Sequence, residues 1–245
     1  MGKAVAFVSG KGGTGKTSMC AAVATCLAAM GDRVLCIDMD VGLRDLDLAL
    51  GMGAEPQLPF TDLADGTYGF DDLQPCPVSE NLFLLTAPVT KTFADIDEGA
   101  FRAFLDRCRE RFDWCLLDAP AGIGAGFRLS AVFADECVIV TGGDDAALRD
   151  GAAAASHLRT FTDAPARVLV NRVSPPLLRR MVRTVDDVMD RVGLPLLGIV
   201  PEDSRVPLAC AKQKPLALYT RKGAASACLR IARRLKGIKT PLTAR

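Results

Sequence analysis

The 245-residue sequence contains one histidine, His157, and none of its nine cysteines forms a Cys-x-x-Cys pair. Because histidine is the most frequent general base and a common metal ligand, its near absence argues against a histidine-based mechanism or metal site. Most of the cysteines lie inside apolar runs. We therefore expect them to be small, buried and reduced side chains rather than ligands of zinc or an iron–sulfur cluster.

Long apolar runs and linkers are also missing. No window approaches 18 consecutive apolar residues, which argues against a membrane-spanning helix. Met1-Gly2-Lys3 leads directly into a strand pattern and lacks the apolar segment of a signal peptide. There is no Pro/Gly/Ser-rich linker, low-complexity run or internal repeat. We expect a cytoplasmic protein in which residues 1–237 form one domain and residues 238–245 a short basic tail.

Acidic residues are absent from the segment Ser204–Arg245, which holds eleven lysines and arginines. The segment Asp38–Glu98, in contrast, holds thirteen acids and only two bases, Arg44 and Lys91. The net charge of +1 hides this asymmetry. Such a basic end either faces an anionic neighbour, a membrane or a nucleic acid, or is simply a solvated surface.

Short, continuously apolar runs alternate with longer helical patterns along the whole chain. Strands are predicted at Ala4–Ser9, Val34–Asp38, Leu82–Thr86, Trp114–Asp118, Cys137–Thr141, Arg167–Asn171 and Leu196–Val200. Helices are predicted at Lys16–Met30, Glu98–Arg111, Gly126–Ala134, Ala146–Phe161, Leu177–Val192 and Lys222–Leu235. This alternation predicts an α/β fold with a doubly wound, mainly parallel sheet covered by helices on both faces. Ligands of such sheets bind at the carboxyl ends of the strands.

The first strand is followed by a glycine-rich loop and then an alanine-rich helix. The spacing Gly-x4-Gly-Lys-Thr is that of a P-loop, in which glycine backbone amides surround a phosphate at the N-terminus of a helix. Lys16 is expected to neutralise the β- and γ-phosphates and the Thr17 hydroxyl to bind Mg²⁺. The predicted nucleotide-binding residues of this segment are Gly10, Lys11, Gly12, Gly13, Thr14, Gly15, Lys16, Thr17 and Ser18.

Three carboxylates follow neighbouring strand patterns, where a P-loop needs acids. Asp38 and Asp40 come at the end of the second predicted strand, and Asp118 ends the fourth. Asp38 and Asp118 are predicted to support the metal, and Asp40 to orient the attacking water. Gly122, four residues after Asp118, can offer its amide to the γ-phosphate.

The lysine directly after the first glycine of the loop is unusual among P-loops. The pattern Lys-Gly-Gly-x-Gly-Lys-Thr, with Lys11 in first place, resembles the deviant Walker A ATPases of the MinD/ParA family. The run Asp38–Gly51 and the stretch Asp118–Gly122 are most similar to the MinD branch of that family. The resemblance implies an ATP-sandwiched homodimer in which Lys11 acts in trans on the partner's phosphates.

The resemblance continues to the end of the predicted sheet. Asn171 and Arg172 stand where the family's asparagine reads adenine, and Pro201, Glu202 and Asp203 resemble the loop on the other side of the base. After the fifth strand the family usually has Thr-x-Pro-Glu, whereas this chain has Thr141-Gly142-Gly143-Asp144-Asp145. That departure bears on the identity of the partner rather than on the ATPase chemistry.

The resemblance implies Mg²⁺-dependent hydrolysis of ATP to ADP and phosphate, slow without a partner, with Lys11, Lys16 and Asp40 as catalytic residues. It implies placement of the division septum, or of related polar or flagellar machinery, together with a division inhibitor or ATPase-activating protein. The alternative is a ParA-like ATPase that binds DNA non-specifically for chromosome or plasmid partition. A metabolic kinase is less compatible with the sequence, because little chain is left for a substrate lid.

The C-terminal helix pattern has two interpretations. Cys228, Ile231, Leu235 and Ile238 share one predicted helical face, opposite three arginines. A basic amphipathic helix can lie on an anionic membrane, which the family resemblance also implies, and would make the protein peripheral on the inner face of the cell membrane. The same pattern fits a last core helix that packs on the sheet. The sequence leaves both interpretations open.

Overall fold

The computed structural model describes residues 1–41, 45–53, 57–89, 91–174, 176 and 185–242. Residues 42–44 of the Asp38–Gly51 run, the first part of the predicted helix Leu177–Val192 and the last three residues of the tail lie outside this description.

A seven-stranded sheet runs through the described chain in the order β3-β2-β4-β1-β5-β6-β7, and all its named pairings are parallel. The strands are β1 (Lys3–Val8), β2 (Val34–Asp38), β3 (Leu82–Leu85), β4 (Trp114–Asp118), β5 (Glu136–Thr141), β6 (Ala166–Val173) and β7 (Leu196–Pro201). The predicted doubly wound parallel sheet is therefore confirmed. The strand residues are almost all buried, as expected when helices cover both faces.

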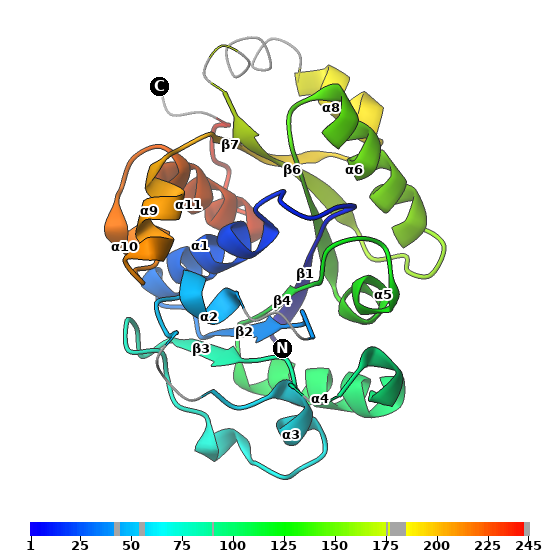
Figure 1. Ribbon diagram of the computed structural model, residues 1–245, viewed down its shortest axis with the longest axis vertical. Helices are drawn as coiled ribbons and strands as arrows, with labels where there is room; N and C mark the ends of the chain where they lie inside the picture. Colours follow the sequence, from blue (N-terminus) through cyan, green and yellow to red (C-terminus); the bar gives the residue numbers. More distant parts are fainter. Residues whose placement is uncertain (42–44, 54–56, 90, 175, 177–184, 243–245) are drawn as a thin grey trace.

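Helices lie between successive strands, and three more follow β7 at the end of the chain (Figure 1). They are α1 (Lys16–Ala29), α2 (Leu46–Ala49), α3 (Phe60–Ala64), η1 (Phe70–Asp72), η2 (Phe93–Asp95), α4 (Glu98–Arg111), α5 (Ala125–Val132), α6 (Asp145–Leu158), α8 (Val185–Val192), α9 (Arg205–Ala211), α10 (Leu216–Tyr219) and α11 (Ala224–Leu235). None of the described helices is long and apolar enough to cross a bilayer.

Alternate side chains of each strand enter different cores. Val5 and Phe7 of β1 belong to the core beneath α1 and α11, whereas Ala6 and Val8 belong to the core beneath α5, α6 and α8. Helices α3 and α4 cover the remaining part of that second face, over β2, β3 and β4. Figure 1 shows this division, with α1 and α11 on one side of the strands and α4, α5 and α6 on the other.

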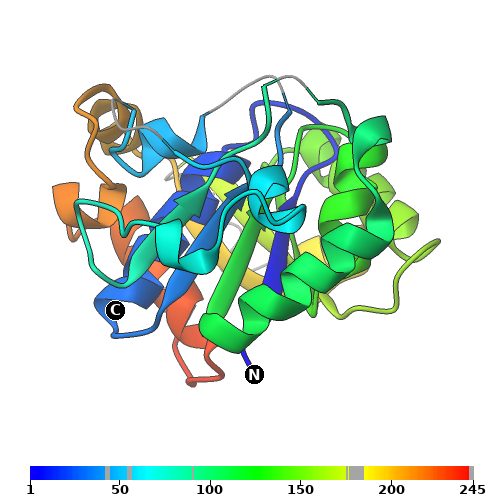
Figure 2. The same cartoon turned by 90° about the horizontal axis from the view of Figure 1, so that it is seen from below.

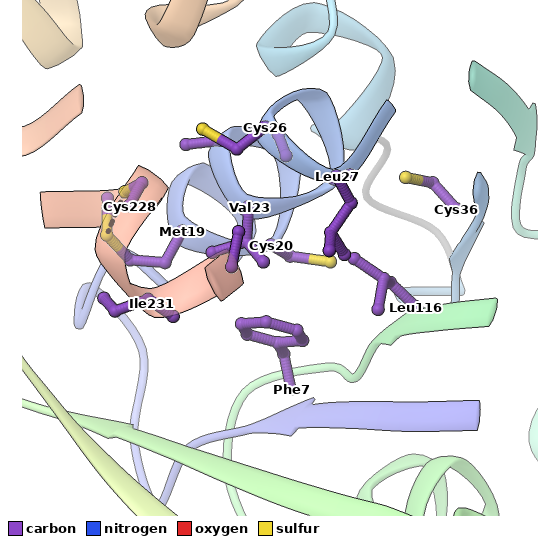
Figure 3. Close-up of a cluster of buried hydrophobic side chains, with 14 of the residues drawn as sticks. Phe7, Met19, Cys20, Val23, Cys26, Leu27, Cys36, Leu116, Cys228 and Ile231 are labelled. Atoms are coloured by element: carbon purple, nitrogen blue, oxygen red, sulfur yellow. Dashed lines mark hydrogen bonds between the residues drawn. The ribbon is translucent and has the colours of Figure 1, made fainter. Parts of the chain in front are cut away.

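Helix α11 is a core helix. Its apolar side chains Cys228, Ile231 and Leu235 are buried, and Figure 3 shows Cys228 and Ile231 beside Met19 of α1. The helix ends at Leu235, and the left-handed Gly237 (φ 76°) follows, so the prediction that Ile238 continues the same helical face is wrong. For α11 the core-packing interpretation is confirmed, because its apolar face is buried against α1 and β7.

Residues 238–242 turn back along α11. The Arg230 guanidinium donates to the carbonyl of Leu242 at 3.3 Å, and that of Arg234 donates to the carbonyl of Thr240 at 2.9 and 3.1 Å. Two arginines of the basic run are thus used for intramolecular contacts. Arg233 and Lys239 are exposed.

All strands run in the same direction, so their carboxyl ends share one edge of the sheet. In Figure 2, β1 rises from the N-terminus, and the loop that follows it lies at the opposite edge of the molecule together with α2 and α9. Asp38 of β2 and Asp118 of β4 are register partners at this edge. This edge brings together the residues described next.

Candidate nucleotide site

The loop between β1 and α1 has the backbone of a phosphate cradle. Gly13 and Gly15 adopt left-handed conformations, with φ of 77° and 81°, which glycine allows without steric cost. Helix α1 begins at Lys16, directly after Gly15, so its unpaired N-terminal amides face the loop. The sequence prediction of a glycine-rich turn between a strand and a helix is confirmed in form.

Space also requires glycine in this loop. A Cβ atom on Gly10 would lie 2.6 Å from the carbonyl oxygen of Asp150 in α6, and one on Gly15 would lie 2.4 Å from Nδ2 of Asn171. A Cβ atom on Gly13 would meet nothing within 4 Å, so the loop is open on that side. A cleft of about 500 Å³ extends along Gly12–Ser18 toward Asp40. Its size and its glycine backbone fit a polyphosphate.

Lys16 and Asp118 form a buried ion pair. The ammonium nitrogen lies 2.7 Å from Oδ1 of Asp118, and the two side chains are 7% and 2% exposed. Burial raises the pKa of Asp118 above its ordinary value, although the Lys16 charge and hydrogen bonds from Lys16 and Thr17 oppose that effect. In this protein the loop lysine therefore already faces an acid of the neighbouring strand.

Asp38 is a second buried carboxylate next to Asp118. Its oxygens accept hydrogen bonds from the backbone amides of Asp40, at 2.9 Å, and Leu46, at 3.4 Å. Burial and then the charge of Asp118 raise the pKa of Asp38 to about 7. Asp40 lies at the cleft, half-buried, and burial raises its pKa as well. The three acids predicted from the sequence are thus gathered at one edge.

The donor set suits Mg²⁺ bound together with phosphate oxygens. Thr17 lies in hydrogen-bond contact with Asp118, and Asp38 lies beside Asp118 in the sheet. Among the residues that the structure describes, no group of three or more His, Cys, Asp or Glu side chains forms a complete metal cage. Mg²⁺ in phosphate-transfer sites commonly takes only one or two protein ligands, so Thr17, Asp38 and Asp118 fit such an ion.

Lys11 lies at the outer rim of the loop and is about half exposed. Its ammonium group pairs with Oδ2 of Asp150 in α6 at 2.7 Å, and this hydrogen bond raises the pKa of Lys11. Lys11 therefore points along the protein's own surface rather than into the Lys16–Asp118 pair. No sequence pattern predicts the contact of Asp150, because that contact depends on how α6 packs beside the loop.

A second cleft, of about 290 Å³, adjoins the loop on the β6 side. Asn171, Arg172 and Glu202 line it together with Gly142, Gly143 and Asp144. The Asp144 carboxylate accepts a hydrogen bond from the amide of Ala147 at 2.9 Å and thereby caps α6. The segment that departs from the usual Thr-x-Pro-Glu pattern thus forms both a wall of this cleft and the start of a helix.

The remaining predicted residues are placed differently. Pro201 ends β7 and pairs with Val173 of β6. The Asp203 carboxylate is occupied within the protein: Oδ1 accepts from Arg205 at 2.7 Å, and Oδ2 accepts from the amide of Ala224 at 2.9 Å. Burial opposes ionisation, but these hydrogen bonds outweigh it and lower the pKa of Asp203. These contacts point to a structural role for Asp203 at the start of α11.

The structure also places the predicted glycine Gly122 and three cleft residues that the sequence analysis did not single out. Gly122 adopts a left-handed conformation after β4 (φ 86°), with open space around it, as an amide aimed at a ligand requires. Asp45, Leu48 and Cys210 also line the larger cleft, and no sequence motif predicts that they do. Cys210 is the exposed member of the nine free cysteines, whereas the other eight are buried as expected.

Comparisons with known proteins agree with this geometry. Residues 5–216 match the sequence profile of the CobQ/CobB/MinD/ParA nucleotide-binding domain. The chain is 33% identical to the septum site-determining protein MinD of Synechocystis sp., over 98% of this chain and 92% of that protein. Its fold is similar to MinD in a MinC:MinD cell division complex from Aquifex aeolicus (TM-score 0.87, 30% identity, 99% and 98% of the two chains). It is also similar to a Pyrococcus horikoshii MinD complexed with Mg-ADP (TM-score 0.81, 25% identity, 96% of each chain).

Proposed function

Because the chain belongs to the CobQ/CobB/MinD/ParA nucleotide-binding family, we propose that it is an ATP-dependent dimerising switch of the MinD type. It hydrolyses ATP to ADP and phosphate and thereby controls placement of the cell-division septum. Its cofactors are ATP and Mg²⁺. One observation supports this function above the others: the Gly10–Thr17 loop shares one sheet edge with the acids of β2 and β4.

Each side chain at this edge has a role that its position supports. Lys16, which pairs with Asp118 in the single chain, would neutralise charge on the β- and γ-phosphates, and Asp118 would then be available to the metal. Thr17 and Asp38 would be the other protein groups that hold the metal. Mg²⁺, when bound, stabilises the negative charge that develops on the transferred phosphoryl group.

Asp40 is the residue that we assign to orienting the attacking water. It lies at the cleft beside the loop, and its raised pKa reflects partial burial. The described lining of the cleft contains no histidine, and a carboxylate alone is a weak general base. We therefore expect slow intrinsic turnover that a protein partner accelerates.

Lys11 is exposed, so it can reach a second copy of the chain. Its pairing with Asp150 holds it at the surface in the single chain, and an exposed ion pair of this kind costs little to break. We propose that ATP favours a homodimer in which Lys11 contacts the partner's phosphates.

A division inhibitor is the protein partner that we propose, since one similar structure is a MinC:MinD cell division complex. Attachment to the inner face of the membrane is peripheral and uses exposed bases such as Arg233 and Lys239. The apolar face of α11 is not available for it, because that face is buried against α1 and β7.

Size-exclusion chromatography of an Asp40→Ala variant tests the switch. With ATP the variant should elute as a dimer, because nucleotide binding is kept and hydrolysis is slowed, and with ADP it should elute as a monomer. Asp186→Ala, which removes an exposed acid of α8, is the matched control and should hydrolyse ATP like the wild type. A monomer under both conditions would defeat the dimer model.

The alternative function is that of a ParA-like DNA-binding ATPase. The exposed bases of α11 and the tail suit DNA phosphates as well as lipid headgroups. Gel shifts with non-specific duplex DNA over a salt series separate the two functions. Binding that requires ATP and weakens steeply with salt would favour partition over septum placement.

A further inference from the structure

The phosphate loop is attached to the end of β6 by two neighbouring side chains. Nδ2 of Asn171 donates to the carbonyl oxygen of Thr14 at 2.8 Å, and Nη1 of Arg172 donates to the carbonyl oxygen of Gly13 at 3.3 Å. Two successive carbonyl groups of the loop are therefore directed toward β6.

The direction of these carbonyls determines the direction of the amides that follow them. In a trans peptide the C=O and the next N–H point in opposite directions, and the described chain contains no cis peptide. Holding the carbonyls of Gly13 and Thr14 toward β6 thus turns the amides of Thr14 and Gly15 away from it. Within the described part of the chain, neither amide donates a hydrogen bond to another protein group. Both remain available to phosphate oxygens.

The two side chains are fitted closely to the loop. Asn171 is 4% exposed, and its Nδ2 atom occupies the space that a Cβ atom on Gly15 would need. Arg172 adopts a left-handed backbone conformation (φ 57°), which is unfavourable for a residue other than glycine. Its guanidinium group also pairs with Glu202 at 3.7 Å. Strained residues of this kind persist where surrounding contacts fix them, and they are concentrated at functional sites.

We propose that Asn171 and Arg172 are positioning residues for the phosphate loop. They act through the carbonyls of Gly13 and Thr14 and hold the loop amides ready for a polyphosphate, whichever base the nucleotide carries. A residue that only reads the base would affect the choice between nucleotides and would leave a ligand without a base unaffected. This role rests on the nucleotide site proposed above and adds to it a means of pre-organisation.

Inorganic tripolyphosphate with Mg²⁺ is the probe that separates the two roles, because it carries the phosphates without a base. Its affinity for the full-length chain is measured by calorimetry beside those of ATP and GTP, for the wild type and for Asn171→Leu. Leucine has a similar volume and no charge, so it removes the hydrogen bond without adding electrostatic repulsion. We expect affinities for tripolyphosphate and ATP to fall by a similar factor, about five- to tenfold for one lost hydrogen bond, with the ATP/GTP ratio unchanged.

Unchanged tripolyphosphate affinity, with an altered ATP/GTP ratio, would overturn the positioning role and leave Asn171 as a base-reading residue. A wild-type chain that binds neither ATP nor tripolyphosphate would overturn the proposed nucleotide site instead. The two failures are therefore distinguishable.

Matched variants exclude a general loss of structure. Asn81→Leu makes the same change at the beginning of β3, at the opposite end of the sheet, and should bind tripolyphosphate like the wild type. Asn171→Gln retains an amide donor and should recover part of the lost affinity, which a purely structural defect would not predict. If Asn171→Leu does not fold, Asn171→Ser provides the smaller change, and Arg172→Lys tests the second contact while keeping the charge.

Discussion

The ammonium nitrogen of Lys16 lies 2.7 Å from Oδ1 of Asp118, and both side chains are almost completely buried. In the absence of phosphate this pair neutralises the centre of the site. Any anion that recruits Lys16 must compete with Asp118 for it. The pair therefore links the stability of the fold to occupation of the loop.

Lys16→Ala should destabilise the protein as well as prevent nucleotide binding. The substitution leaves Asp118 buried without its cation, a change that costs about 3–5 kcal/mol in comparable pairs. Lys16→Ala/Asp118→Asn should recover most of that loss, because the unpaired charge is then gone. Urea unfolding of Lys16→Ala, Asp118→Asn and the double variant gives the coupling free energy between the two side chains. Additive losses would show that the pair contributes no buried charge interaction.

Asp38 makes the stability of the ligand-free protein depend on pH. Burial and then Asp118 raise its pKa to about 7, whereas the same carboxyl ionises near pH 4 in an unfolded chain (about 3.9 for a free side chain). Between about pH 4 and pH 7 the folded state holds a proton that the unfolded state has released, so the free energy of unfolding falls as pH rises through this window.

Asp38→Asn should therefore flatten that slope. The wild type should lose on the order of 2–4 kcal/mol between about pH 5 and pH 8 relative to the variant. The absolute stability of the variant is less informative, since asparagine has one acceptor oxygen, and its NH₂ group would face one of the two amides, Asp40 or Leu46, that donate to the carboxylate. If the free energies of unfolding of the wild type and of Asp38→Asn, measured with urea, changed in parallel with pH, the raised pKa of Asp38 would be contradicted.

The sequence predicts the strands and the long helices more accurately than the short helices between them. The ranges of β2, β4 and α4 agree residue for residue, because continuous apolar runs and a well-capped amphipathic pattern define them. Helices α2, α3, α9 and α10 have four to seven residues, which is too few for a periodic pattern to predict them.

The candidate site shows the same limit. The loop and the acids of β2 and β4 follow directly from their positions after strands, whereas the partners of those residues depend on tertiary packing. Asp150 reaches Lys11 only because α6 lies beside the loop. Asp203 resembles a base-binding residue in sequence, yet its carboxylate holds Arg205 and the start of α11. Local patterns cannot reveal contacts between segments so far apart.

Lys11→Ala should separate nucleotide binding from dimerisation. The Lys11–Asp150 pair is exposed, and exposed ion pairs contribute little to stability, so the variant should fold and unfold like the wild type. It should bind ATP but remain a monomer. Lys91→Ala breaks a comparable exposed pair with Asp65 and should still dimerise. Analytical ultracentrifugation with ATP compares the two, and an ATP-dependent dimer of Lys11→Ala would remove the role in trans.

Asp203→Ala should affect the fold more than the ligand. It removes the acceptor of the Ala224 amide and the partner of Arg205, at a cost of about 2 kcal/mol, or ~4–8 °C in thermal midpoint. Because the pKa of Asp203 is lowered, its contribution should be present at neutral pH and disappear as the pH falls below the ordinary range of a carboxyl. Calorimetry should show little change in ATP affinity. A large loss of affinity with an unchanged midpoint would restore the predicted base contact.

The C-terminal end should divide into a core helix and a dispensable tail. Deletion of residues 238–245 removes the carbonyls that Arg230 and Arg234 hold but leaves the apolar face of α11 buried, so the fold should persist. If the tail carries membrane attachment, sedimentation with anionic vesicles and ATP should fall to the level seen with ADP. Ile231→Ala, in contrast, opens a cavity against α1 and β7 and should lower stability by about 2–5 kcal/mol. Equal vesicle binding by the truncated and intact chains would assign the lipid contact to the bases of the folded domain.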